Sequence, residues 1–417
     1  MEGKRLGTIF NSDINNILVA CGGEATTPES YQRAVYAILN MRPGVVAQNV
    51  GMPDPVIYRT EVATTWDKYH KQVTELVWPE TKPEVAGQQS AAMRRLLEAG
   101  TDPLTLTIEA CRQRGTPIVA SYRMNAEDFY HGTTLMSDFE RAHPEWKIPG
   151  ADCLDPAVPE VYAHRMDIFR EVAERYDIDG IEFDFRRWYH MVSNPLKNHG
   201  VLTKMVRETR EMLDQVARRK GRAKMLLGAR VGPSLDSEPD PFMFPGIYYD
   251  QKPTNASCRE LGLDVRTWLA EGLVDYICPS LFLASLPGMP LTAELAALAE
   301  GTEIGVYPTL WPLAAWEHGI HEMYITLEPK DRKALALYKD LLCTTALQMY
   351  EDGADGISTF NWYSHLHEAY PSLPWPEEPG SSGPGPSLVQ TYIYPLLKSR
   401  AEIRGYRSQP WAAPPQE

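Results

Sequence analysis

At 417 residues, with a formal net charge of −14, the chain is long enough for one large domain or two to three average ones, and it is acidic overall. The acidity excludes a broad basic surface, so we expect neither nucleic acid nor an anionic membrane as a partner, and a neutral or weakly charged one fits better. No apolar run approaches the roughly 20 residues that span a bilayer.

Two features of the sequence bear on the compartment. Residues Met1–Ile14 run directly into a strand-like segment without an apolar signal core. This predicts no secretory signal, so the protein stays inside the cell or a leader has been removed. The six cysteines are scattered and form no CxxC pair, which predicts free thiols rather than disulfide bonds or a metal site.

Short β-rich segments alternate with amphipathic helical segments, and this alternation predicts βα units with a parallel sheet. The expected strands are Thr8–Asp13, Val45–Gln48, Ile118–Tyr122, Gly180–Phe185, Met225–Arg230, Tyr276–Leu281, Glu303–Pro308 and Gly356–Phe360. The helices between them include Pro28–Leu39, Pro103–Arg114, Pro159–Tyr176, Leu202–Arg219, Val265–Glu271 and Pro329–Glu351. Eight such units predict an α/β fold, a single (β/α)8 TIM barrel.

The whole chain, residues 1–417, is interpreted as one catalytic barrel domain. Its eighth helix is expected at about residues 388–403, after a Gly/Ser/Pro-rich loop at 378–387. The segment after that loop is too short to form a domain of its own. Three long βα loops are expected, after the second, third and fifth strands. In this fold the βα loops build the active-site face, so they should wall the binding site.

The fourth strand carries the strongest functional signal. Side chains alternate along a strand, so Glu182, Asp184 and Arg186 should face the barrel interior and its mouth, while the apolar residues between them face the helices. Acids at the carboxyl end of a barrel strand are typical of catalytic groups. The alternative is a buried layer of ion pairs that only orders the barrel.

The region from Arg123 to Leu283 resembles the family 10-like glycoside hydrolases. The resemblance rests on four segments in order, namely Pro144–Trp146, Leu154–Pro156, Pro159–Val161 and Arg175–Asp184, and on the sixth strand around Val274–Pro279. It implies a barrel that cleaves glycosidic bonds, with Asp184 in the catalytic position. The family's second aspartate is replaced here by Phe185.

A weaker resemblance to family 18 chitinases lies in the same strand. Their pattern DxxDxDxE is echoed by Asp179, Glu182 and Asp184, with Arg186 in place of the final acid. That replacement argues against the substrate-assisted mechanism of the chitinases.

Glycoside hydrolysis uses two carboxylates, and the sequence leaves the pairing open. Glu182 and Asp184 could form the pair themselves, or Glu182 could tune Asp184 while a loop supplies the partner. The loop candidates are Glu317, Asp236, Glu238 and Asp13, of which Glu317 is included as a catalytic candidate. The expected substrate-binding residues are Asp13, Arg123, Asn125, Arg186, Trp188, Arg230, Tyr307, Trp311, Asn361 and Trp362.

No cofactor or metal is expected. His190, His365 and His367 lack a ligand spacing such as HxxxH, and no phosphate-binding glycine loop or nucleophile elbow is present.

The sequence therefore predicts a glycoside hydrolase acting on an oligo- or polysaccharide. The arginines expected at the mouth suggest an anionic or sulfated sugar. Two alternatives remain: a carbohydrate-binding barrel without catalysis, and a lyase or isomerase that uses the same acids. The sequence gives no indication of the oligomeric state.

Overall fold

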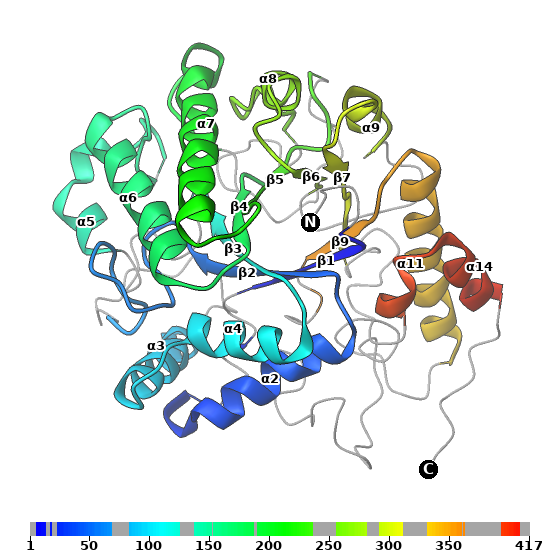
Figure 1. Cartoon of the computed structure of the whole chain (residues 1–417), viewed down its shortest axis with the longest axis horizontal. Helices are drawn as coiled ribbons and strands as arrows, with labels where there is room; N and C mark the ends of the chain where they lie inside the picture. The colour runs from blue at the N-terminus through cyan, green and yellow to red at the C-terminus, as the bar shows by residue number, and fades with distance from the viewer. Residues whose placement is uncertain are drawn as a thin grey trace.

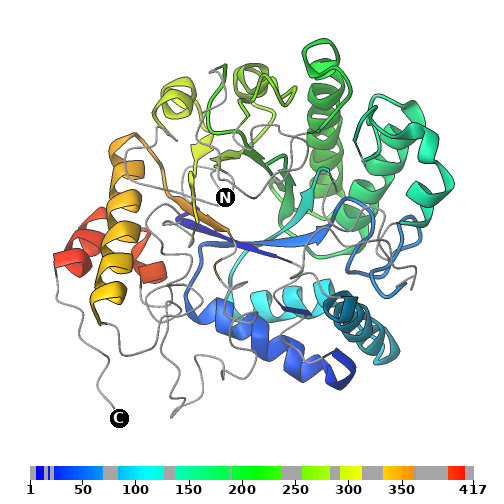
Figure 2. The same ribbon diagram turned by 180° about the vertical axis from the view of Figure 1, so that it is seen from behind.

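The computed structural model describes a defined part of the chain. The described residues are 6–13, 17–18, 23–68, 83–125, 137–151, 153–186, 190–236, 256–281, 292–311, 332–360, 362 and 393–408. Within them, helices surround a curled sheet whose strands gather near the centre of the molecule (Figure 1). The view from behind shows the same arrangement (Figure 2).

The sheet is parallel and has the order β7-β6-β5-β4-β3-β2-β1-β9-β8. Its strands are β1 Thr8–Ser12, β2 Val45–Gly51, β3 Ile118–Arg123, β4 Gly180–Asp184, β5 Leu226–Val231, β6 Tyr276–Pro279, β7 Gly305–Val306, β8 Thr309–Leu310 and β9 Ile357–Phe360. All eight expected strands are present, with ends that differ by a few residues. Their run of neighbours in chain order is the arrangement that βα units produce.

The expectation of eight strands was wrong in one respect, because the seventh is divided into β7 and β8. β7 pairs with β6, while β8 pairs with β9. Between them, the amide of Tyr307 donates to the carbonyl of Ile277, and the carbonyl of Pro308 accepts from the amide of Ser358. Since proline has no amide hydrogen, Pro308 interrupts the ladder where the segment changes partners.

Helices follow the strands and cover the outside of the sheet (Figure 1). Their bounds are α2 Pro28–Asn40, α3 Pro83–Glu98, α4 Pro103–Arg114, α5 Asp138–Ala142, α6 Pro159–Arg175, α7 Pro195–Arg219, α8 Val265–Ala270, α9 Ala293–Ala299, α11 Arg332–Glu351 and α14 Arg400–Ser408. Short 3-10 turns are η2 Gly23–Ala25, η3 Pro144–Trp146 and η5 Tyr394–Leu396.

Three helices were not expected from the sequence. α3 and α5 lie in segments interpreted as long βα loops, and α9 follows β6. α7 begins at Pro195, seven residues before the expected start at Leu202, because proline suits the first helical turn. The expected eighth helix at 388–403 is instead η5 followed by α14 among the residues described there.

The core has an inner and an outer part. Ile9, Val45, Val119 and Leu226 form a buried cluster inside the curl of the sheet, together with Tyr276 and Tyr307. A larger cluster joins the opposite faces of the strands to the helices. On β4, Phe183 packs against Phe169 of α6 with ring centroids 4.8 Å apart. The alternation predicted for this strand is thus confirmed.

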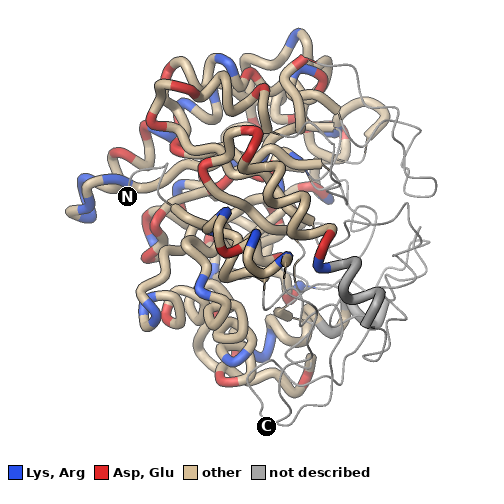
Figure 3. Tube along the Cα trace, turned by 90° about the vertical axis from the view of Figure 1, so that its right-hand side faces the viewer, with Lys and Arg blue, Asp and Glu red and all other residues tan. Residues whose placement is uncertain are grey.

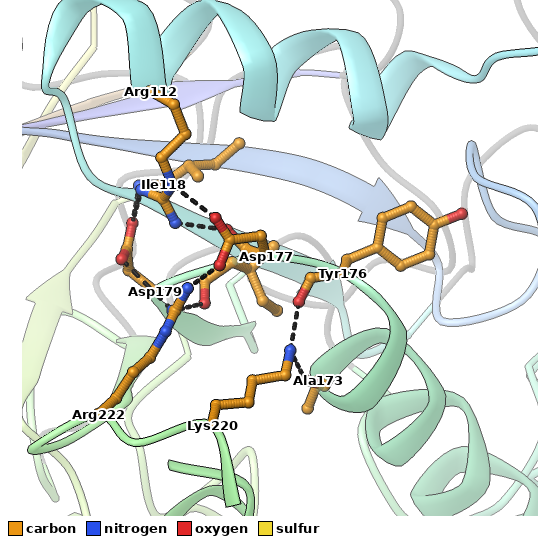
Figure 4. Close-up of polar contacts among 9 residues, drawn as sticks. Arg112, Ile118, Ala173, Tyr176, Asp177, Asp179, Lys220 and Arg222 are labelled. Atoms are coloured by element: carbon orange, nitrogen blue, oxygen red, sulfur yellow. Dashed lines mark hydrogen bonds and ion pairs between the residues drawn. The ribbon is translucent and has the colours of Figure 1, made fainter.

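A cluster of ion pairs holds the amino end of β4 (Figure 4). Arg112 of α4 contacts Asp177 and Asp179 at 2.9 and 2.7 Å, and Arg222 contacts the same two acids from the other side. Asp179 also accepts a hydrogen bond from the amide of Ile118, the first residue of β3. We call these residues the β4 clamp. Asp179 therefore belongs to the edge opposite Asp184, which removes it from any DxxDxDxE active-site motif.

Basic and acidic residues are interspersed over the described part of the chain rather than separated by sign (Figure 3). No helix among the described residues combines the length and hydropathy needed to cross a membrane.

Candidate functional site

Glu182 lies inside the curl of the sheet, where three other strands supply hydrogen-bond donors. Its Oε1 accepts from Asn11 Nδ2 of β1 and Ser121 Oγ of β3, both at 2.9 Å, and its Oε2 accepts from Tyr276 OH of β6 at 3.0 Å. The prediction that Glu182 faces the interior is confirmed. Both carboxyl oxygens are occupied, so this residue is better placed to organise its neighbours than to attack a substrate.

Tyr276 reaches Glu182 through a gap left by Gly228 on β5. A methyl group built on Gly228 would lie 2.0 Å from Cζ of the Tyr276 ring, far inside van der Waals contact. Gly228 stands beside Glu182 in the pairing of β4 with β5. The glycine is needed here for space rather than for its backbone conformation.

Burial raises the pKa of Glu182, and the nearby charge of Asp184 raises it further, against the hydrogen bonds from Ser121 and Tyr276 and the charge of Arg230. The unfolded state has a glutamate pKa near 4.3, and the folded state has a higher one. Between these two pKa values the folded state keeps the proton that the unfolded state has lost. The stability of the fold therefore falls as pH rises through this window.

We accordingly expect Glu182→Gln to gain stability relative to the wild type as pH rises, because glutamine keeps the shape without the ionisable proton. Chemical unfolding of both proteins at about pH 4 and pH 8 measures this, the lower pH lying near the unfolded pKa. A constant difference in free energy of unfolding would mean that the pKa of Glu182 is the same in the folded and unfolded states. A loss of relative stability by Glu182→Gln at the higher pH would show that the fold stabilises Glu182 as a carboxylate.

Asp184 ends β4 and is fully buried with Arg230 of β5, each side chain being 0% exposed. Asp184 Oδ1 accepts from Arg230 Nε at 3.0 Å and from the amide of Arg186 at 2.9 Å. Its Oδ2 has no hydrogen-bond partner in the described structure. One oxygen is thus held in place while the other is unoccupied, an arrangement suited to a base or nucleophile.

Arg230 is held on a second side by an aromatic ring. Its guanidinium carbon lies 3.7 Å from the centroid of Phe360 of β9 and 5.8 Å from that of Trp311, which is buried beside it. Trp311 Nε1 donates to Ser280 Oγ at 3.3 Å. Trp311 therefore lies with the charged residues, and its ring packs against Phe360.

A second buried ion pair joins Asp13, which follows β1, to Arg123 at the end of β3. Arg123 Cα is the register partner of Asp184, so this pair lies next to the Asp184–Arg230 pair. Asp13 Oδ2 contacts Arg123, while Asp13 Oδ1 has no hydrogen-bond partner among the described residues. Asp13 thus resembles Asp184, because in each carboxylate one oxygen is bound by an arginine and the other has no hydrogen-bond partner among the described residues.

Two further predicted residues, Arg186 and Asn125, border the same edge. Arg186 Nε donates to the carbonyl of Ser280 at 2.9 Å, and burial together with the charge of Arg230 lowers the pKa of Arg186 to about 9. Asn125 Nδ2 donates to the carbonyl of His190 at 2.7 Å. The structure thus brings Asp13, Arg123, Asn125, Glu182, Asp184, Arg186, Arg230 and Trp311 to one end of the sheet.

Two predicted residues do not join this group. Tyr307 belongs to the inner apolar cluster, and its hydroxyl accepts from the amide of Leu6, before β1, at 3.0 Å. Trp362 packs against Tyr394, which also contacts Phe10 on the outer face of β1. Strand alternation no longer applies to Trp362, because β9 ends at Phe360.

Other candidates fall outside this group. Glu317, Trp188 and Asn361, with the alternative partner Glu238, lie outside the described residues. Asp236, another of the alternative partners, is half-exposed and forms an ion pair with Arg266 at 2.7 Å.

Sequence reasoning missed Ser121, Tyr276 and Phe360. The signal was available for Ser121, which precedes the predicted Arg123 by two residues and therefore shares its face of β3. Hydroxyls and rings inside a barrel are common as packing, so only their contacts with Glu182 and Arg230 mark them.

Within the described ranges, no cluster of three or more His, Cys, Asp or Glu side chains is arranged to hold a metal ion.

Comparison with known proteins gives a distant likeness. No family model matches the chain. The protein named glycosyl hydrolase DigH from Escherichia coli K12 is 26% identical over 214 residues, which cover 44% of this chain and 46% of that protein. The identically named protein of Shigella flexneri matches to the same extent. The chain thus spans about half the length of the curated relatives it matches.

Solved structures with partial likeness were also found. The glycoside hydrolase domain of PgaB (BpsB) from Bordetella bronchiseptica has a TM-score of 0.44 and 12% identity, covering 87% of this chain and 95% of that one. An α-L-fucosidase from Paenibacillus thiaminolyticus has a TM-score of 0.43 and 11% identity, covering 96% and 49%. Both TM-scores lie below 0.5, and the fold of this chain is defined by its own strand pairing.

Proposed function

We propose that this protein is a glycoside hydrolase that cleaves an O-glycosidic bond of an oligo- or polysaccharide, with Asp184 as its nucleophile or general base. The observation that carries the proposal is the state of Asp184. It ends a central strand, is fully buried, has one oxygen fixed by Arg230 and leaves the other without a partner in the described structure. Both retaining and inverting mechanisms use a positioned carboxylate that has an oxygen without a protein partner.

The proposal includes a complete (β/α)8 barrel. It is supported by hydrogen bonds on both sides of residues 305–310: the amide of Gly305 donates to the carbonyl of Asp275, and the amide of Asp355 donates to the carbonyl of Val306. A segment bonded to β6 on one side and to β9 on the other joins the two edges of the curled sheet.

We further propose a single domain across residues 1–417. The support lies in α14, which packs on α11 through an ion pair of Arg407 with Asp340 at 2.7 Å, while Ile403 is buried in the main core. The C-terminal helix is thereby part of the same packed unit.

For the second carboxylate, Asp13 has the best support among the described acids. Glu182 uses both oxygens to accept hydrogen bonds, which suits a residue that tunes Asp184. Asp13 is buried, faces the same end of the sheet and has an unoccupied Oδ1. Glu317 stays a prediction, as do Trp188 and Asn361 as substrate-binding residues. The proposed roles of Arg123, Asn125, Arg186, Arg230 and Trp311 are to hold the two acids and the sugar.

The name of the E. coli relative, glycosyl hydrolase, supports the same reaction class. The test is release of new reducing ends from a panel of oligosaccharides, followed by mass spectrometry. Cleavage of at least one glycan by the wild type is the expected result. Binding of a glycan without any cleavage across the panel would instead establish the carbohydrate-binding barrel.

A further inference from the structure

Five buried oxygen atoms line the carboxyl end of the first four strands without a hydrogen-bond partner. They are Asn11 Oδ1, Asp13 Oδ1, Asn49 Oδ1, Asn125 Oδ1 and Asp184 Oδ2, and none has a partner within the described part of the chain. We call them the acceptor rim. All five side chains are at least nine-tenths buried. Buried polar atoms are normally satisfied, so a group of five on neighbouring strands requires an explanation.

These atoms are identified as acceptors by the hydrogen bonds and ion pairs that the second polar atom of the same side chain makes. Asn11 Nδ2 donates to the carboxylate of Glu182, and Asn125 Nδ2 donates to a backbone carbonyl. Exchanging the positions of Oδ1 and Nδ2 in either amide would place its oxygen against another oxygen. The second oxygens of Asp13 and Asp184 are taken by arginines. Among these five side chains, only Asn49, with both amide atoms unoccupied, also offers a donor.

The charges of the arginines at this end of the sheet are already engaged, although two of their nitrogens, Arg123 Nε and Arg230 Nη1, make no hydrogen bond in the described structure, against five acceptor oxygens. Arg123 is paired with Asp13, and Arg230 with Asp184 and the Phe360 ring. Arg186 donates to a backbone carbonyl. An incoming carboxylate or sulfate would have to compete with these partners and would also face the unoccupied oxygens.

From this imbalance we infer that the site takes a ligand that donates hydrogen bonds, a hydroxyl-rich neutral sugar or an amino sugar carrying ammonium groups, and discriminates against carboxylated or sulfated sugars. This inference rests on the proposed function and replaces the anionic substrate suggested by the arginines in the sequence. Sugar hydroxyls that donate to the rim would satisfy acceptors that the protein leaves open.

The direct test uses oligosaccharides that differ in one group. β-1,4-mannohexaose and the β-1,4-mannuronate hexamer differ only in the carboxylate at C6, while cellohexaose and the glucosamine hexamer differ in the ammonium at C2. Calorimetric titration of the full chain should show binding of a neutral or ammonium-bearing member at least tenfold tighter than the mannuronate hexamer. The second pair separates hydroxyl from ammonium donors.

A pair of neighbouring variants provides a test that does not depend on the choice of sugar. Asn49→Leu removes a buried amide that has no partner, so the thermal midpoint should stay level or rise, while binding of the preferred hexamer weakens about tenfold. Gln48→Leu is the matched control. Gln48 lies on the opposite face of β2, where its amide donates to the carbonyls of Ser12 and Asn49. It should lower the midpoint and leave binding unchanged.

The outcomes separate the two proposals. Tighter binding or faster cleavage of the mannuronate hexamer would overturn the donor-ligand inference and leave glycoside hydrolysis standing. A clear loss of stability in Asn49→Leu would also overturn it, because the amide would then have a partner in the protein. Failure of all four hexamers to bind or to be cleaved would count against both the inference and the proposed function.

Discussion

Asp184→Asn is expected to reduce turnover by about three powers of ten or more, the loss typical for removal of a general base or nucleophile. Asparagine keeps an oxygen for Arg230 Nε and for the amide of Arg186, but it lacks the charge and basicity of the carboxylate. Arg230 then remains buried opposite a neutral group, so the free energy of unfolding should also fall, by up to about 3 kcal/mol. The measurement is the initial rate of reducing-end release, taken well below the unfolding midpoint of both proteins.

Because Asp184→Asn lowers the free energy of unfolding as well as removing a charge, its control must lower the free energy of unfolding by a similar amount at a position away from Asp184. Asp275→Asn serves, since Asp275 is buried, forms an ion pair with Arg210 at 3.1 Å and accepts from the amide of Leu227 at 2.8 Å. It precedes β6, at the edge of the sheet opposite Asp184. The control should unfold more easily yet keep its rate. Equal rates for the two variants would make Asp184 a structural residue.

Gly228→Ala is expected to destabilise the fold by about 2 to 3 kcal/mol, the range for overpacking a core. The added methyl would lie 2.0 Å from the Tyr276 ring, which must move and so lose its hydrogen bond to Glu182. Activity should fall with it, since Glu182 lies beside Asp184 on β4. Denaturant unfolding gives the stability, and the same reducing-end assay gives the rate.

Gly87→Ala is the matched control for that substitution. Gly87 lies within α3, where an added methyl group would meet nothing within 4 Å. Alanine should therefore stabilise the helix by about 0.5 to 1 kcal/mol, because glycine loses more backbone entropy on folding. A similar loss of stability in both variants would mean that the gap at Gly228 is not required for Tyr276.

The strands and the direction of their side chains could be predicted because both depend on local pattern. Alternation along β4 was enough to place Glu182 and Asp184 inside, where hydrogen bonds from β1, β3 and β6 confirm Glu182. Local pattern failed at the seventh strand, where Pro308 divides the ladder, and at Trp362, where the strand had already ended. The catalytic assignments themselves stay predictions.

The pairing of charges could not be predicted, because it depends on register and curvature. Arg230 meets Asp184 because their Cα atoms are partners on neighbouring strands. Arg123 meets Asp13 across the intervening β2, which needs the sheet to curl. The sequence showed three arginines near the mouth and suggested an anionic sugar, whereas the structure shows each of them with a partner.

The β4 clamp has a consequence for how this scaffold could be modified. Arg112, Arg222, Asp177 and Asp179 fix the start of β4 through elements at the amino edge, whereas Asp184 and the acceptor rim lie at the carboxyl edge. The residues that set strand alignment and the residues proposed to contact a ligand therefore lie at opposite edges of the sheet. If the proposed function holds, transplanting the loops that follow the strands from a known glycosidase should change which sugar is accepted while the alignment of β3 and β4 persists. This end of the molecule is therefore the rational place to build a library of variants.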